Sequence, residues 1–303
     1  MQRNTWLRPE KGNSLTIRLL IWVALNLGYR VTALLRWPAT LYYAAVYSSV
    51  RRASWQYLSH LHRAGALRRP HWGMVLRHIH AYSTNTLDRI YLLSGRFPRE
   101  NIHITGQDIL HEALHQNRGC IIMGAHIGSF DALRQCGLNA SVPFRMLMYR
   151  RFIGATSRFI EALAPGFNAD IIELGQPDSM LATLKALRNG EFIGILADRA
   201  HDGGRSIPIR FLGEEAPIPA GPFHLARLTG APVVLVSAIR QKNGTYHIAC
   251  TGLTDTLLPE TEPAPAREAL LSPMQAYVRW MEELCQRHPY AWFNFFDFWE
   301  KGL

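Results

Sequence analysis

The chain has 303 residues, is 48% apolar and carries a formal net charge of +10 at pH 7. This length and apolar content suffice for a large folded core and exclude a disordered or low-complexity chain. Its four cysteines are widely scattered and its 13 histidines show no metal-ligand spacing, so neither a disulfide framework nor a metal site is predicted. We expect reduced thiols in a protein that faces the cytosol.

The positive charge is concentrated in the N-terminal third. Residues 1–99 contain 15 Lys and Arg but only two acids, a net charge of +13, whereas residues 100–303 have a net charge of −3. Such a skew predicts an anionic partner, which can be nucleic acid, acidic lipid or an acidic protein. We do not expect nucleic acid, because no recognised nucleic-acid motif is present.

The same region is rich in Leu, Trp and Tyr, and its periodicity predicts helices over 15–35, 38–63 and 71–94. Arg18, Arg30 and Arg36 interrupt the apolar runs, which disfavours a simple membrane-spanning helix. Helices that lie in the membrane interface fit better, with Trp and Tyr at headgroup depth and Arg on anionic phosphates. Residues 1–99 are therefore predicted to be a membrane-associating region on an anionic membrane surface. The alternative is a soluble helical subdomain with a buried apolar stripe.

From residue 100 onward, strand and helix patterns alternate. This alternation predicts an α/β domain over 100–303 with a mixed, mostly parallel sheet flanked by helices. The predicted strands are 101–105, 120–125, 143–149, 169–173, 191–197, 207–212, 216–219, 232–240 and 246–251. The predicted helices are 107–117, one from residue 129, 154–163, 178–188, 221–228 and 265–287.

The hexapeptide His126-Ile-Gly-Ser-Phe-Asp131 follows the apolar run 120–125 and places a base and a carboxylate five residues apart. On a continuous helix the two side chains would lie about 140° apart, so they meet only if His126 lies in a strand-to-helix turn and Asp131 in the first helical turn. Gly128 permits that turn and Ser129 is a suitable N-cap. An ionised Asp131 would leave one imidazole nitrogen free to accept a proton. The alternative is a histidine bound by backbone and an acid that stabilises a helix N-terminus.

Charged residues also follow two other predicted strands. Arg150 and Arg151 follow 143–149, and Asp198 and Arg199 follow 191–197. If these strands lie parallel to 120–125, the charges converge with His126 and Asp131 on the sheet edge where ligands bind in open α/β folds. For each arginine taken alone, a solvated loop charge is the favoured interpretation, and only the repetition of the pattern favours a site.

The C-terminal segment 288–299 is densely aromatic and too short to span a bilayer. We expect its aromatic rings to pack in the core. A wall for an apolar chain and a membrane contact are the alternatives.

These residues resemble a known family. The His-x4-Asp (HX4D) spacing, the Asp198-Arg199 block and the aromatic close Pro289–Trp299 are similar to those of the late lipid A acyltransferases, the lauroyl/myristoyl transferase family. That family belongs to the lysophospholipid acyltransferase-like superfamily. More closely, nearly the whole chain, from Trp6 to Trp299, resembles the stand-alone branch often found with aryl polyene biosynthesis.

The resemblance implies a glycerolipid acyltransferase-like fold and an inner-membrane enzyme whose catalytic domain faces the cytoplasm. It implies transfer of a fatty acyl group from acyl carrier protein, or less often coenzyme A, to a hydroxyl or amine of a membrane lipid or lipid A-like glycolipid. It also implies His126 as the base, Asp131 as its partner, Arg150 or Arg151 at the oxyanion or a phosphate, and Asp198 and Arg199 in the substrate-contacting block. Many lipid A members have Glu where Asp131 stands.

The chemistry of the residues agrees with acyl transfer. A thioester is already activated, so no cofactor or metal is predicted beyond the acyl thioester as co-substrate. A neutral His126 would take the acceptor's proton, and backbone N–H groups near Gly128 or an arginine would stabilise the oxyanion. Ser129 is a less favoured nucleophile. A non-catalytic lipid-binding or assembly protein and an acyl-thioester hydrolase are the alternative functions.

Overall fold

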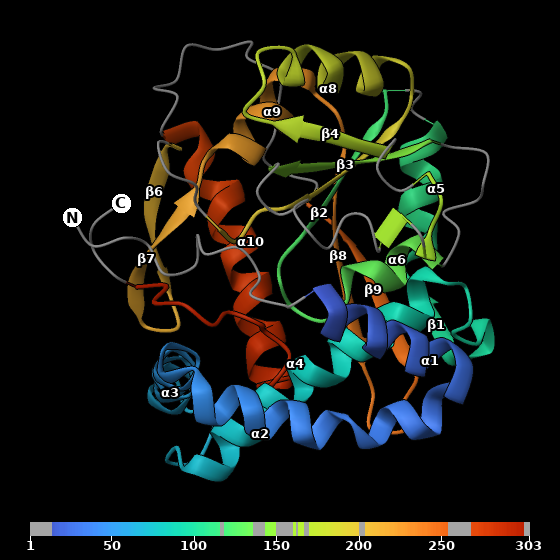
Figure 1. Ribbon diagram of the computed structural model, residues 1–303. Helices are drawn as coiled ribbons and strands as arrows, with labels where there is room; N and C mark the ends of the chain where they lie inside the picture. The colour runs from blue at the N-terminus through green and yellow to red at the C-terminus, as the bar shows by residue number, and fades with distance from the viewer. Residues whose placement is uncertain are drawn as a thin grey trace.

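The computed structural model describes residues 14–115, 118–135, 143–149, 160–161, 163–166, 170–199, 204–253 and 268–299. These residues form a seven-stranded sheet with helices on both sides and a separate two-stranded hairpin (Figure 1). This arrangement confirms the predicted α/β class.

The described chain begins with the helices α1 (Ser14–Leu34), α2 (Arg36–Val46), α3 (Ser48–Arg63) and α4 (Trp72–Leu93). The predicted helices over 15–35 and 71–94 are confirmed. The single helix predicted over 38–63 is wrong, because Tyr47 has an extended backbone (φ −104°, ψ 90°) that separates α2 from α3. Gly28, at φ 80°, places a kink inside α1.

The sheet has the strand order β1-β9-β8-β2-β5-β3-β4. Strands β8, β2, β5, β3 and β4 are parallel to one another, whereas β9 is antiparallel to β8 and β1 is parallel to β9. The predicted mixed, mostly parallel sheet is therefore confirmed. The strands are β1 (Ile102–Thr105), β2 (Cys120–Gly124), β3 (Phe144–Tyr149), β4 (Ile171–Leu174), β5 (Phe192–Leu196), β8 (Val233–Arg240) and β9 (Tyr246–Gly252).

The remaining elements connect these strands. β6 (Ser206–Phe211) and β7 (Glu214–Pro219) form an antiparallel hairpin outside the main sheet. The connecting helices are α5 (Gln107–His115), α6 (Phe130–Gln135), α8 (Ser179–Arg188), α9 (Gly221–Thr229) and α10 (Glu268–Arg287), with a 3-10 turn at Arg99–Asn101. The helix predicted over 154–163 lies mostly outside the described residues.

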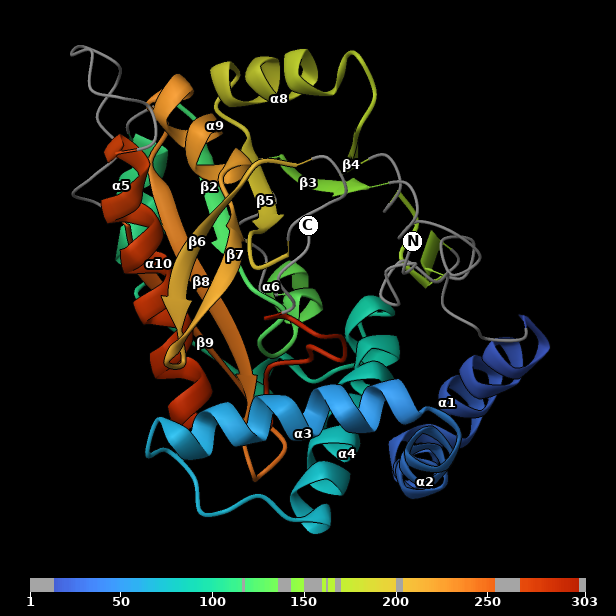
Figure 2. The same cartoon turned by 90° about the vertical axis from the view of Figure 1, so that its left-hand side faces the viewer.

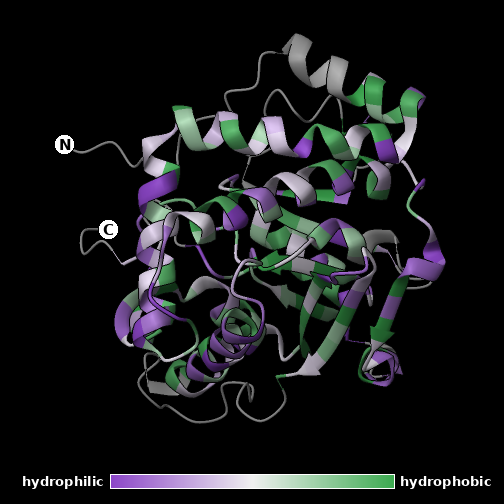
Figure 3. Cartoon of the chain, turned by 90° about the horizontal axis from the view of Figure 1, so that it is seen from below, coloured by the Kyte–Doolittle hydropathy of each residue, from purple (hydrophilic) through white to green (hydrophobic). Residues whose placement is uncertain are grey.

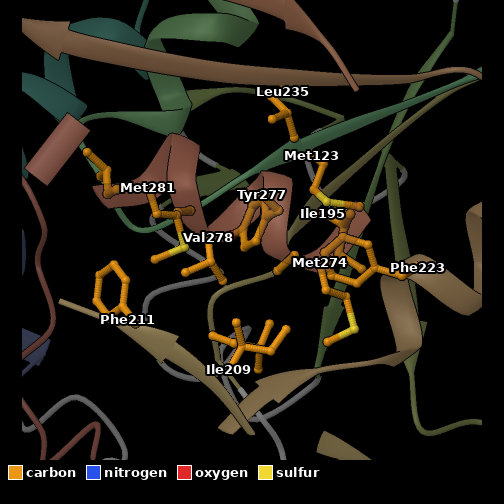
Figure 4. Packing of buried hydrophobic residues seen from close by; sticks show 14 of the residues in the cluster. Met123, Ile195, Ile209, Phe211, Phe223, Leu235, Met274, Tyr277, Val278 and Met281 are labelled. Carbon is orange, nitrogen blue, oxygen red and sulfur yellow. The ribbon is translucent and has the colours of Figure 1, made fainter. Parts of the chain in front are cut away.

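Strand β2 is buried on both faces of the sheet, as expected for a central parallel strand. Ile121 and Met123 contribute to a core with α8, α9, α10 and the β6–β7 hairpin, whereas Cys120 and Ile122 contribute to a second core with α1, α4 and α5. Figure 2 accordingly shows α10 on one side of the strands and α1 far from it on the other. Figure 4 shows the first core, in which residues of α9 and α10 pack against strand residues. The labelled residues are Met123, Ile195, Ile209, Phe211, Phe223, Leu235, Met274, Tyr277, Val278 and Met281.

The N-terminal helices share a core with the sheet. Residues of α3 and α4 belong to the same buried cluster as Met123 of β2 and Ile195 of β5; they are Tyr57, Leu58, Leu61, Val75 and Ile79. The predicted domain division between residues 99 and 100 stays a prediction. Within the described residues, no helix combines the length and apolar character that crossing a bilayer requires.

Large apolar side chains are exposed on α1 and α2. They are Trp22, Leu27, Val31, Leu34, Trp37, Leu41, Tyr42, Tyr43 and Val46. Figure 3 views the molecule from the side on which α2 lies and shows hydrophobic residues among polar ones along its helices. Membrane association through this region stays a prediction.

Candidate functional site

The register of two parallel strands brings His126 and Asp198 together. β2 and β5 are hydrogen-bonded neighbours, and the last paired residues are Gly124 and Leu196. His126 and Asp198 each lie two residues beyond that pair, at the carboxyl edge of the sheet. His126 Nδ1 lies 2.7 Å from Asp198 Oδ1, and the backbone N–H of His126 donates to Asp198 Oδ2 over 3.1 Å. The predicted convergence of these two residues is confirmed.

The surroundings favour a neutral imidazole beside a charged carboxylate. Burial acts to raise the pKa of Asp198, but His126, Arg199 and the Trp292 indole outweigh it and hold the pKa well below its ordinary value. Burial and the nearby Arg199 lower the pKa of His126, against the opposing effect of Asp198. Because Asp198 is ionised, Nδ1–H of His126 is the donor of the 2.7 Å bond. Nε2 then carries the lone pair that can accept a proton.

The prediction that Asp131 binds the imidazole of His126 is wrong, because Asp198 makes that hydrogen bond. Asp131 does lie in the first turn of α6 and His126 in the preceding bend, as predicted. The Asp131 carboxylate, however, forms an ion pair with Arg89 of α4, with Oδ2 3.1 Å from Nε. Both side chains are described, and no hydrogen bond joins His126 to Asp131. The physical reason is that the side chain of Asp131 is directed to the neighbouring helix α4, while the adjacent strand already supplies a carboxylate to Nδ1.

Gly128 is required by the turn that follows His126. Its φ is +77°, and a Cβ atom there would lie 2.0 Å from the carbonyl oxygen of Ala238 on β8. The prediction that glycine permits this turn is confirmed. The backbone N–H of Gly128 donates to Ala291 O and that of Ser129 to Ala238 O, both over 2.8 Å. These two donors are therefore already used and do not form an oxyanion site in this conformation.

Ser129 does not have the predicted capping bond. Its side chain is buried, and its Oγ has no hydrogen-bond partner. The prediction of a side-chain N-cap is therefore wrong, although the residue lies directly before α6 as expected.

Arg199 is the described arginine at the site. Its Nη2 donates to Phe293 O over 2.9 Å, and its guanidinium lies over the ring of Phe296, 5.3 Å from the centroid. Its Nε is buried and has no hydrogen-bond partner in the protein. Arg150 and Arg151 lie outside the described residues, and their predicted role stays a prediction.

A contact from the C-terminal segment was not predicted from the sequence. The indole N–H of Trp292 donates to Asp198 Oδ2 over 3.0 Å, and the ring is fully buried. Packing of this segment in the core was predicted and is confirmed for Trp292, Phe298 and Trp299. The density of aromatic residues was a signal for burial, but nothing in it indicated which ring touches Asp198.

The arrangement can take a proton and stabilise the positive charge that results, as a histidine–carboxylate pair does in a catalytic triad. In the described part of the chain, no group of three or more His, Cys, Asp or Glu side chains is placed to hold a metal ion.

A comparison with known families identifies the region that contains this site. A family model described as bacterial lipid A biosynthesis acyltransferase matches residues 89–301, which include His126, Asp131, Asp198, Arg199 and Trp292. A search of curated proteins finds no match to the chain. The family match covers more than half of the chain, from the end of α4 through the whole sheet to the aromatic segment. The chain therefore belongs to the bacterial lipid A biosynthesis acyltransferase family.

Proposed function

We propose that this protein transfers a fatty acyl group from an acyl thioester to a hydroxyl or amine of a membrane lipid or lipid A-like glycolipid. His126 is the general base and Asp198 its partner. The donor is acyl carrier protein thioester, with acyl coenzyme A as the alternative. The observation that carries the proposal is the 2.7 Å bond between His126 Nδ1 and Asp198 Oδ1 at the carboxyl edge of a parallel sheet, inside the family-matched region.

The proposed reaction uses the second imidazole nitrogen. As the acceptor oxygen forms a bond with the thioester carbonyl carbon, its proton passes to Nε2 of His126. Asp198 stabilises the imidazolium that results. The C–S bond then breaks, and the leaving thiolate receives the proton from His126. The acyl group passes directly to the acceptor, without a covalent enzyme intermediate.

Arg199 is proposed to contact the developing oxyanion or an anionic substrate group. Its buried Nε lacks a partner, and a buried cation is effective where negative charge develops because little water screens it. Arg150 and Arg151 are proposed to contribute to the same function.

We also propose that the protein acts at the cytoplasmic face of the inner membrane, held there by α1 and α2. The exposed Trp, Tyr and Leu side chains of these helices support this proposal. The net charge of +13 over residues 1–99 supports attraction to anionic lipid. The aryl polyene-associated branch remains a proposal within the family.

The test of the proposed function is acyl transfer by the His126→Ala variant. We expect the rate to fall about 10²–10⁴-fold, the typical contribution of a general base, while the circular dichroism spectrum is unchanged. The matched control is His224→Ala, because His224 is an exposed histidine on α9. Labelled acyl carrier protein thioester and a lipid extract supply donor and acceptor.

Three results would contradict the proposal. Undiminished transfer by His126→Ala would show that His126 is not the general base. Acyl release that does not depend on added lipid would indicate a hydrolase. Vesicle binding without turnover in the wild-type protein would indicate a non-catalytic lipid-binding protein. Lipid analysis of a deletion strain, complemented by the wild type or by His126→Ala, identifies the acceptor and tests the aryl polyene branch.

A further inference from the structure

The carboxylate of Asp198 is bound on both of its oxygens. Oδ1 accepts a hydrogen bond from the imidazole of His126. Oδ2 accepts two hydrogen bonds, one from the backbone N–H of His126 over 3.1 Å and one from the indole N–H of Trp292 over 3.0 Å. Asp198 is itself fully buried. The orientation of this carboxylate therefore depends on the two donors at Oδ2.

We propose that Trp292 is a positioning residue for the His126–Asp198 pair: its indole N–H holds Asp198 Oδ2 so that Oδ1 stays directed at His126 Nδ1. This inference rests on the proposed function for its effect on turnover. The hydrogen-bond geometry on which it stands does not depend on the substrate.

The indole ring of Trp292 is held in place from several elements. It makes edge-to-face contacts with four aromatic rings. The centroids of Tyr57 of α3, Phe211 of β6 and Phe298 lie 4.9–5.2 Å away, and that of Trp299 lies 6.1 Å away. A ring enclosed in this way has one orientation. Its N–H is therefore a fixed donor rather than one that must be ordered during the reaction.

The backbone of Trp292 is held as well. His78 of α4 is fully buried and donates from Nε2 to the carbonyl oxygen of Trp292 over 2.8 Å. Ser54 of α3 lies 2.9 Å from His78 Nδ1 and fixes the orientation of the imidazole. A chain of buried contacts thus runs from α3 through α4 to Trp292 and Asp198.

The segment that carries Trp292 also pairs with the loop that carries His126. Trp292 forms an isolated antiparallel bridge with Ile127. The N–H of Phe293 donates to His126 O, and the N–H of Gly128 donates to Ala291 O, both over 2.8 Å. The C-terminal segment therefore positions the histidine through its backbone and the carboxylate through the Trp292 side chain.

Removal of the indole N–H has a defined electrostatic consequence. Asp198 loses one donor that stabilises its charge, so the His126–Asp198 pair binds a proton more readily. The acidic limb of the pH–rate profile and the titration of His126 should both move to higher pH. A merely structural role in the core predicts lower stability without this shift.

The experiment compares Trp292→Phe with Trp299→Phe. Trp299 is a matched control, because it is also buried in the aromatic cluster and its indole N–H donates to a backbone oxygen, Phe211 O, over 3.2 Å. Its ring contacts that of Trp292 edge to face, and phenylalanine keeps an aromatic ring at this contact. The titration of His126 is followed by nitrogen-15 NMR of the histidine side chains, with His126→Gln used to assign the resonance. We expect an upward shift of about half a unit or more in Trp292→Phe and none in Trp299→Phe.

Turnover provides a second readout. We expect Trp292→Phe to lower kcat by about 10- to 100-fold, the fold-change of one hydrogen bond to a charged group. The KM values for thioester and lipid should stay within about twofold, because the indole touches neither. Trp299→Phe should keep the wild-type kcat and pH profile.

An isosteric replacement keeps the test decisive if Trp292→Phe does not fold. Trp292→β-(3-benzothienyl)alanine replaces the ring N–H by sulfur and retains the ring shape. An unshifted His126 titration in the folded isosteric variant overturns the proposal, as does an equal shift in Trp299→Phe. The His126 titration requires no substrate, so it tests the role of Trp292 even if the protein does not transfer acyl groups. Failure of the proposed function would appear only in the transfer assay and can be told apart from failure of this proposal.

Discussion

At the scale of single residues, the environment of one buried carboxylate defines the site. Asp198 is ionised because His126, Arg199 and Trp292 all surround it with positive charge or N–H donors. Burial and Arg199 keep His126 in its neutral form, which is the form that can accept a proton. Asp131, the acid of the His-x4-Asp spacing in the sequence, forms an ion pair with Arg89 instead. Two carboxylates near one histidine thus have different partners.

The two carboxylates are predicted to differ in their effect on turnover. Asp198→Asn keeps the shape of the residue but removes the charge and the tautomer preference of His126, so kcat should fall about 10³–10⁴-fold. Asp131→Asn removes a partly exposed ion pair, and its effect on kcat should be at least about tenfold smaller. Steady-state kinetics of the two variants side by side tests this order. An equal or larger loss in Asp131→Asn would restore Asp131 as the partner of His126.

At the scale of secondary-structure elements, helix α4 connects the N-terminal helices, the sheet and the site. Its His78 binds the backbone of Trp292, its Asp88 binds Arg240 of β8, and its Arg89 binds Asp131 of α6. Asp88 is fully buried, and its carboxylate contacts side chains from four elements: Tyr29 of α1, Arg36 of α2, Arg240 of β8 and Tyr246 of β9. One buried carboxylate therefore links α1 and α2 to the sheet strands β8 and β9.

Asp88→Ala should destabilise the fold strongly. The substitution leaves two arginines beside a buried site without their carboxylate, and breaking a buried ion pair typically costs about 3–5 kcal/mol. The matched control is Glu283→Ala, which breaks the exposed pair with Arg287 on α10 and should cost no more than about 0.5 kcal/mol. Urea unfolding followed by tryptophan fluorescence measures both. Similar free energies of unfolding for the two variants would refute a structural role for the Asp88 cluster.

The buried His78 should make folding stability depend on acid pH. Burial lowers its pKa from the ordinary 6.5 to about 4, so the folded state favours the neutral ring. The resulting stabilisation is complete above pH 6.5 and is lost as the pH falls toward 4, with a maximum of about 3 kcal/mol. In His78→Gln the free energy of unfolding should change less between these pH values than in the wild type. His224→Gln, at an exposed histidine, should follow the wild type; a His78→Gln variant with the wild-type slope would contradict the prediction.

At the scale of the whole molecule, apolar and basic residues gather on the N-terminal helices. The exposed apolar residues of α1 and α2 accompany a net charge of +13 over residues 1–99, whereas residues 100–303 carry −3. A surface that combines both properties suits an anionic bilayer, where buried apolar area and electrostatic attraction add. Contact of α1 and α2 with the bilayer would hold the sheet and its site at the membrane surface.

Loss of two exposed leucines should weaken vesicle binding. Leu34→Ser combined with Leu41→Ser removes apolar area from α1 and α2 and should lower the partition coefficient to phosphatidylglycerol vesicles by about tenfold or more. The matched control is Met180→Ser with Leu181→Ser on α8, which are equally exposed apolar residues at the opposite end of the molecule (Figures 1 and 2). Vesicle co-sedimentation at low and high salt measures binding, which should weaken as salt rises. Equal losses for both pairs would exclude α1 and α2 as the specific contact.

Local patterns in the sequence determined the elements and the class of the fold. The apolar runs at 120–125 and 191–197 are β2 and β5, since strands buried on both faces are continuously apolar. Because these two strands were expected to be parallel, His126 and Asp198 could be predicted to lie at the same edge of the sheet. Helix length was less predictable. Residues 38–63 have a continuous helical pattern, but the extended backbone of Tyr47 divides them between α2 and α3.

The partners within the site were decided by tertiary structure alone. Which carboxylate reaches His126 Nδ1 depends on the register of β2 with β5 and on the presence of Arg89 of α4 beside Asp131. The contact from Trp292 depends on the path of a segment far along the chain, which pairs with the loop after β2. Spacing along the sequence carries information about neighbours within one helix or strand. Hydrogen bonds between separate elements are set by how those elements pack. For this reason the His-x4-Asp spacing drew attention to His126 but did not indicate that Asp198 is the carboxylate bound to it.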